Sequence, residues 1–167
     1  MIYPPPTANA RKRPEAGRGR FTVPDASKIN CKRVVLGGIL GGVVWNLWSI
    51  IINMAFLAKR YATAQAAGEF LKEPRYPGFV VWYMLLLIVL AIGLAWLYAA
   101  SRATLGAGPL SALKVGLVVG LIGSVPFNFA ESAWAPISRF FPLGWTLEGL
   151  GGCILATLFA GWYYRES

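Results

Sequence analysis

The chain has 167 residues, of which 56% are hydrophobic and 14% are charged, with a mean hydropathy of +0.54 and a net charge of +9. A soluble domain carries about a quarter charged residues, so this composition excludes an ordinary soluble domain and is typical of a polytopic membrane protein. The two cysteines and the absence of histidine remove the usual zinc ligands and the commonest general base, so we expect no metal site, no catalytic set and no enzymatic activity.

Residues 1–33 form a basic arm that is rich in Pro, Arg and Gly. Such a segment has too little apolar surface to fold alone, so we expect an extended cytoplasmic tether. Anionic lipid headgroups or a protein partner would order it, whereas no aromatic interleaving supports nucleic acid. The residues predicted to dock on a partner or on lipid are Arg11, Lys12, Arg13, Arg18 and Arg20.

Four apolar segments follow, at 34–58, 79–100, 110–130 and 143–164, and residues 165–167 form a short tail. Each segment has the roughly 20 residues that cross a hydrocarbon core of about 30 Å. Backbone groups in lipid must be paired within their own segment, so we predict an all-α bundle of four transmembrane helices over 34–164. Residues 61–73 either continue the first helix or lie on the membrane surface.

The distribution of Lys and Arg predicts the orientation of the chain. After four crossings the basic arm and the carboxyl terminus share one side, which holds most of the Lys and Arg residues. The positive-inside rule therefore predicts a multi-pass protein of the inner (plasma) membrane with both termini in the cytoplasm.

The stretch VVLGGILGGVVWNLWSIIIN, residues 34–53 of the first apolar segment, contains a doubled small-xxx-small pattern. In lipid no hydrophobic effect drives helices together, so close backbone approach between small residues provides the contact. The third segment repeats the pattern. The residues predicted to pack helices are Gly37, Gly38, Gly41, Gly42, Gly116 and Gly120.

Asn46, Ser49 and Asn53 follow these glycines on one helical face. We interpret them as packing residues whose amides bond across to another helix; the alternative is a path for a polar solute or a site for a pigment or an ion. The neighbouring tryptophans either fill a gap in the bundle or stack on a lipid, carotenoid or chlorin ring. The candidate cofactor-binding residues are thus Trp45, Trp48, Asn46 and Asn53.

Acidic residues mark the outer ends of the third and fourth segments. Glu131 ends the third, Glu148 lies about a turn and a half into the fourth, and Arg139 lies between them. Because a partly buried carboxylate is unfavourable without a partner, we predict an outer ion pair of Arg139 with one of these glutamates. The alternative is a relay for protons or cations, which Pro126 and Asn128 would favour by breaking the third helix nearby.

The stretches KRVVLGGILGGVVWN, AWLYAASRATLGAGPLSALKVGL and GCILATLFAGWYYRE carry a resemblance over most of residues 32–166. In these motifs the chain resembles a family of uncharacterised bacterial four-helix integral membrane proteins. The resemblance implies the four-helix fold and no particular activity. The basic arm is an addition to the family's pattern, and added arms often attach a protein to a larger assembly.

These features predict a non-catalytic small integral membrane subunit that docks onto and stabilises a larger membrane assembly, bioenergetic or photosynthetic, with lipid or pigment contacts. The alternative is a small transporter or channel for a solute or ion that uses the intramembrane Asn and Glu residues. Loss of transport on Glu148→Gln would favour the alternative.

Overall fold

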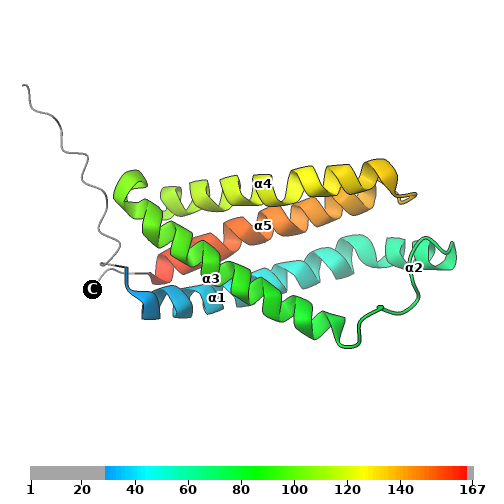
Figure 1. Cartoon of the computed structure of the whole chain (residues 1–167), viewed down its shortest axis with the longest axis horizontal. Coiled ribbons are helices and arrows are strands. Elements are labelled where there is room, and N and C mark those ends of the chain that lie inside the picture. The colour runs from blue at the N-terminus through cyan, green and yellow to red at the C-terminus, as the bar shows by residue number, and fades with distance from the viewer. Residues whose placement is uncertain (1–28, 165–167) are drawn as a thin grey trace, which may run out of the picture.

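The computed structural model describes residues 29–164, and every regular element among them is a helix (Figure 1). The basic arm up to residue 28 and the tail 165–167 lie outside the described residues, and so do the five predicted docking residues from Arg11 to Arg20. The elements in chain order are α1 (Cys31–Ile51), η2 (Ile52–Leu57), α2 (Ala58–Ala66), α3 (Phe79–Leu105), α4 (Pro109–Trp134) and α5 (Phe140–Tyr163).

The four helices that the sequence predicts are present, with longer bounds. The first continues to Ala66, so residues 61–66 extend the first helix, whereas residues 67–73 lie in the loop that follows it. The third does not break at Pro126 and runs on to Trp134. Proline removes one backbone hydrogen bond, but a membrane-type helix tolerates this loss where neighbouring groups compensate. The fourth begins at Phe140, before the uniformly apolar part of its sequence.

The bundle is built around the pair α1 and α5, with α3 packed against α1 and α4 packed against α5. The start of α1, the α3–α4 loop and the end of α5 lie together at one end of the bundle, while α2 and the α4–α5 loop lie at the other, here called the α2 end (Figure 1). At the first end the backbone N–H of Asn30 donates a hydrogen bond to the Tyr164 hydroxyl oxygen at 3.2 Å. The helices therefore alternate in direction.

The segment η2 is a π-helix that changes which side chains of the first helix face α5. This row contains Trp45 and Trp48 of α1 and Ile52 at the start of η2, at helical spacings of three and four residues. The next member is Leu57, five positions on, which is fully buried against α5. The extra residue thus directs the side chain of Leu57 into the bundle. Regular α-helical spacing would instead turn Lys59 toward α5, and in the structure Lys59 is exposed at the edge of the bundle.

Two glycines of α1 allow the backbone of α3 to approach closely. A Cβ atom added to Gly42 would lie 2.7 Å from the Cα atom of Ile88, and one added to Gly38 would overlap the backbone of Ile92. Real side chains do not approach a backbone atom so closely. The absence of a side chain at these two positions therefore sets the distance between α1 and α3.

The other predicted packing glycines lie at contacts with α5. A Cβ atom on Gly41 would lie 2.5 Å from the carbonyl oxygen of Ala156, and one on Gly116 would lie 2.8 Å from that of Cys153. The double glycine pattern of α1 thus divides into one face for α3 and one for α5. The six predicted packing glycines, all at close helix contacts, are Gly37, Gly38, Gly41, Gly42, Gly116 and Gly120.

Most large apolar side chains of the bundle point outward, and its interior is made mainly of small residues. Ala91, Ala95, Ala156 and Ala160 are buried, whereas large residues such as Ile122 are exposed on the outside. A soluble protein rarely exposes such extensive apolar surface. Four helical stretches among the described residues, of 36, 27, 26 and 24 residues, are long and apolar enough to cross a membrane.

Candidate functional site

Glu148 is a buried carboxylate inside the apolar bundle, with only 7% of its surface exposed. Its Oε2 atom accepts a hydrogen bond from the Tyr83 hydroxyl at 2.9 Å, and its Oε1 atom accepts one from Nε1 of Trp45 at 3.3 Å. The two donors come from α3 and α1, so one side chain of α5 links three helices. Trp45, Tyr83 and Glu148 are called the Glu148 cluster below.

Both donors in the Glu148 cluster are neutral, and among residues 29–164 the structure records no Lys or Arg that forms an ion pair with this carboxylate. A buried carboxylate with neutral donors can fasten helices together, and it can also take up a proton or a cation. No group of three His, Cys, Asp or Glu side chains suited to a metal ion occurs within the described part of the chain.

The asparagines of α1 bond to backbone carbonyl groups. Nδ2 of Asn46 donates to the carbonyl oxygen of Gly42 at 2.8 Å and to that of Met84 in α3 at 3.2 Å. Nδ2 of Asn53 donates to the carbonyl oxygen of Ser49 at 2.9 Å, one turn earlier in the same helix. The polar row of α1 therefore adjoins the Glu148 cluster along the contact with α3.

The two tryptophans of α1 lie in slots that glycines of α5 leave open. A Cβ atom on Gly152 would overlap the Trp45 ring, and one on Gly151 would lie 2.6 Å from Nε1 of Trp48. Trp45 is 5% exposed, so protein atoms cover its ring. Nε1 of Trp48 donates to the carbonyl oxygen of Leu147 at 3.2 Å. Both indole N–H groups thus bind α5.

The predicted outer ion pair is absent from the described residues. Arg139 and Glu131 are exposed and form no ion pair, and Glu148 accepts hydrogen bonds from Trp45 and Tyr83 instead. The physical reason is the start of α5 at Phe140: eight residues of helix place Glu148 about 12 Å along it, beyond the reach of Arg139. Near these residues Asn128 is buried and donates to Oγ1 of Thr146 at 3.2 Å, which joins α4 to α5.

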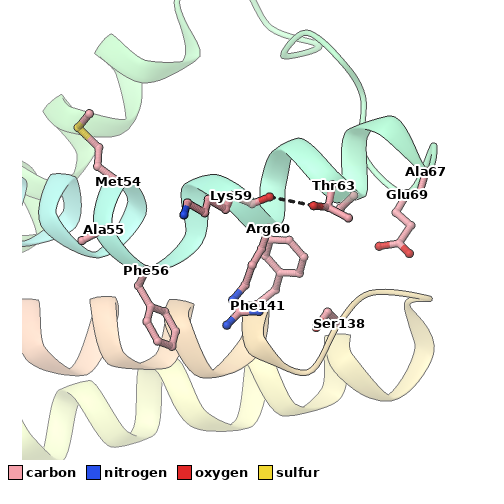
Figure 2. Close-up of a pocket in the computed structure, with 11 residues that line it drawn as sticks. Met54, Ala55, Phe56, Lys59, Arg60, Thr63, Ala67, Glu69, Ser138 and Phe141 are labelled. Atoms are coloured by element: carbon pink, nitrogen blue, oxygen red, sulfur yellow. Dashed lines mark hydrogen bonds between the residues drawn. The ribbon is translucent and has the colours of Figure 1, made fainter.

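A cleft of about 590 Å³ opens at the α2 end of the bundle, between η2, α2 and the start of α5 (Figure 2). Its lining is amphipathic, since charged Lys59, Arg60 and Glu69 alternate with apolar residues such as Met54 and Phe56. Figure 2 shows Arg60 extending from α2 toward α5, and Thr63, whose hydroxyl donates to the Lys59 carbonyl oxygen at 3.0 Å.

Sequence reasoning did not identify Tyr83 or this cleft. In the sequence Tyr83 is one of several aromatic residues near a predicted membrane interface. Its hydrogen bond to Glu148 depends on the way α3 crosses α1. The only sequence signal for the cleft is the pair Lys59 and Arg60 directly after an apolar run. The π-helix that places them has no recognisable sequence pattern.

No protein-family model matches the chain, and no curated protein or solved structure proves similar to it. The resemblance to a bacterial four-helix family therefore stays a prediction.

Proposed function

We propose that the chain is a multi-pass protein of the plasma membrane with both termini in the cytoplasm, and that it serves as a non-catalytic subunit docked onto a larger membrane assembly. The apolar exterior and the small-residue interior of the bundle support insertion in lipid. The basic arm would assist attachment by its charge. In this role the outward faces would contact lipid or a pigment.

The observation that carries the proposal is a pair of glycines with nothing packed on them. Gly93 in α3 and Gly123 in α4 are exposed, and an added Cβ atom at either would meet no atom within 4 Å. Glycine within a helix is unfavourable by about 1 kcal/mol relative to alanine. Every other glycine within the long helices of the described chain adjoins a neighbouring helix. These two therefore suit close approach by a helix of another protein.

The experiment is purification of the full chain from its native membrane in mild detergent, followed by mass spectrometry and an absorption spectrum. Other subunits should co-purify in fixed ratio, and Gly123→Leu should remove them without unfolding the chain. Val118→Phe is the matched control, because Val118 is 53% exposed on a different face of α4. A chain that purifies alone, or a Gly123→Leu variant that keeps every partner, would contradict the proposal.

A second candidate is a proton or cation transporter, favoured by the burial of Glu148 without a cationic partner. Transport through reconstituted vesicles should then be lost in Glu148→Gln and kept in Glu131→Gln, since Glu131 is exposed. Equal flux in the two variants would exclude the transport role of Glu148.

A further inference from the structure

The cleft at the α2 end lies at the depth of lipid headgroups if the helices cross a membrane as proposed. Twenty residues of helix from Val34 span about 30 Å, the thickness of the hydrocarbon core, and reach Met54. Lys59 and Arg60 lie one to two turns further, about 8 Å beyond that boundary. The polar part of the cleft therefore falls in the headgroup layer, and the part near Met54 falls at the edge of the acyl chains.

Arg60 lines this cleft, and one of its hydrogen-bond donors has no acceptor in the described chain. Its guanidinium carbon lies 3.6 Å from the centroid of the Phe140 ring and 5.8 Å from that of Phe56, which fixes its plane by cation–π contact. The Nε atom is buried and has no hydrogen-bond partner among residues 29–164. Because a buried donor without an acceptor is unfavourable, the group is suited to an anion that enters the cleft.

The other polar groups of the cleft extend this complementarity. Lys59 supplies a second positive charge on the same side, and its ammonium group has no ion-pair partner in the described chain. Glu69 and Ser138 close the opposite side, from the loop after α2 and from the α4–α5 loop (Figure 2). The lining of the cleft thus contains two cationic side chains, one carboxylate apart from them, and apolar residues toward Met54.

We propose that this cleft binds an aminophospholipid, specifically phosphatidylethanolamine. Its phosphate accepts hydrogen bonds from Arg60 and Lys59, its ammonium group lies against Glu69, and an acyl chain packs along Met54 and Phe56. A guanidinium group is the preferred side chain for bidentate recognition of a phosphate. The inference rests on the proposed membrane insertion and deepens it by naming one bound lipid.

The test is native mass spectrometry of the full chain in mild detergent, with phosphatidylethanolamine and phosphatidylglycerol added at equal concentration. The wild-type chain should retain phosphatidylethanolamine about tenfold more strongly than phosphatidylglycerol, which corresponds to about 1.4 kcal/mol. Arg60→Gln should weaken retention of both lipids about tenfold, while Glu69→Gln should abolish only the preference. Arg75→Gln is the matched control, because Arg75 is exposed and does not line the cleft.

Three results would overturn the assignment. The first is equal retention of the two lipids by the wild-type chain. The second is equal retention of phosphatidylethanolamine by the Arg60→Gln and Arg75→Gln variants. The third is displacement of the bound lipid by millimolar inorganic phosphate. If Arg60→Gln does not fold, Lys59→Gln replaces it, since Lys59 is exposed. Carbonate extraction of membranes separates the two proposals: a chain that is extracted contradicts membrane insertion, whereas a chain that stays inserted without bound lipid contradicts only the lipid site.

Discussion

Trp45 and Glu148 are joined across the α1–α5 contact by a hydrogen bond of 3.3 Å from Nε1 to Oε1. The indole ring reaches this position because Gly152 leaves the space that the ring occupies. The hydrogen bond between Trp45 and Glu148 therefore depends on the absence of a side chain at Gly152. Since Tyr83 completes the carboxylate's partners, the arrangement of three helices responds to changes at any of these residues.

Replacement of Glu148 should separate its polar role from its size. Glu148→Leu leaves the Trp45 N–H and the Tyr83 O–H without an acceptor, and each buried unpaired donor is unfavourable by about 1–3 kcal/mol. Glu148→Gln keeps a carbonyl oxygen for one of the two donors, so its loss should be smaller. Unfolding of the detergent-solubilised protein by a denaturing detergent measures both. Glu131→Gln should be neutral, and equal stability of the Leu and Gln variants would refute the acceptor role.

Gly152→Ala and Gly123→Ala form a matched pair of changes in neighbouring helices. The added methyl group at Gly152 would overlap the Trp45 ring, and such overpacking is unfavourable by about 1–3 kcal/mol. At Gly123 the methyl group meets nothing within 4 Å, so the isolated protein should gain up to about 1 kcal/mol from helix propensity. Thermal unfolding in detergent compares them; a similar loss in both would show that Trp45 does not occupy the space above Gly152.

Asn46→Leu should have a small effect although Asn46 is buried and bonds across to α3. Hydrogen bonds between membrane helices average about 0.6 kcal/mol, so we expect a loss below about 1 kcal/mol. Gly42→Ala, one turn earlier on the same face, should cost about 1–3 kcal/mol because its Cβ atom would lie 2.7 Å from the Cα atom of Ile88. The same denaturing-detergent titration measures the stability loss of both variants. A larger loss for Asn46→Leu than for Gly42→Ala would make the Asn46 amide, and not Gly42, the dominant contact with α3.

The sequence predicts the helices and their small-residue contacts because both depend on local patterns. Apolar runs of membrane length show where helices form, and spacings of four show that Gly38 and Gly42 share one face. The ends of the helices were less predictable. α3 reaches Leu105 and α4 reaches Trp134, since a helix continues past an apolar run until a turn residue or a cap ends it.

The partners of Glu148 could not be predicted, because they depend on which helices meet. Arg139 was expected from its nearness along the chain and from opposite charge. The actual partners, Trp45 and Tyr83, are 103 and 65 residues away and are uncharged. Neither periodicity nor charge selects them, and only the packing of α1 between α3 and α5 brings them to the carboxylate.

The π-helix η2 predicts an unusual tolerance to deletion. A π-helix of this kind is an α-helix with one inserted residue, so deleting the exposed Ala55 should restore an α-helical turn. The interval from Ile52 to Leu57 would shrink to four residues, and Leu57 would still face α5. Deletion of Val43, which is also exposed and lies in the regular part of α1, would instead rotate the two parts of the helix by about 100° relative to each other.

Expression and thermal unfolding of the two deletion variants compare these cases. The Ala55 deletion should yield a folded protein whose melting temperature lies within a few degrees of the wild-type value, since a change of 1 kcal/mol shifts it by about 2–8 °C. The Val43 deletion should not fold, because Gly38 and Gly42 could no longer face α3 together with Asn46. If the Ala55 deletion fails as completely as the Val43 deletion, the extra residue of η2 does more than correct the direction of Leu57.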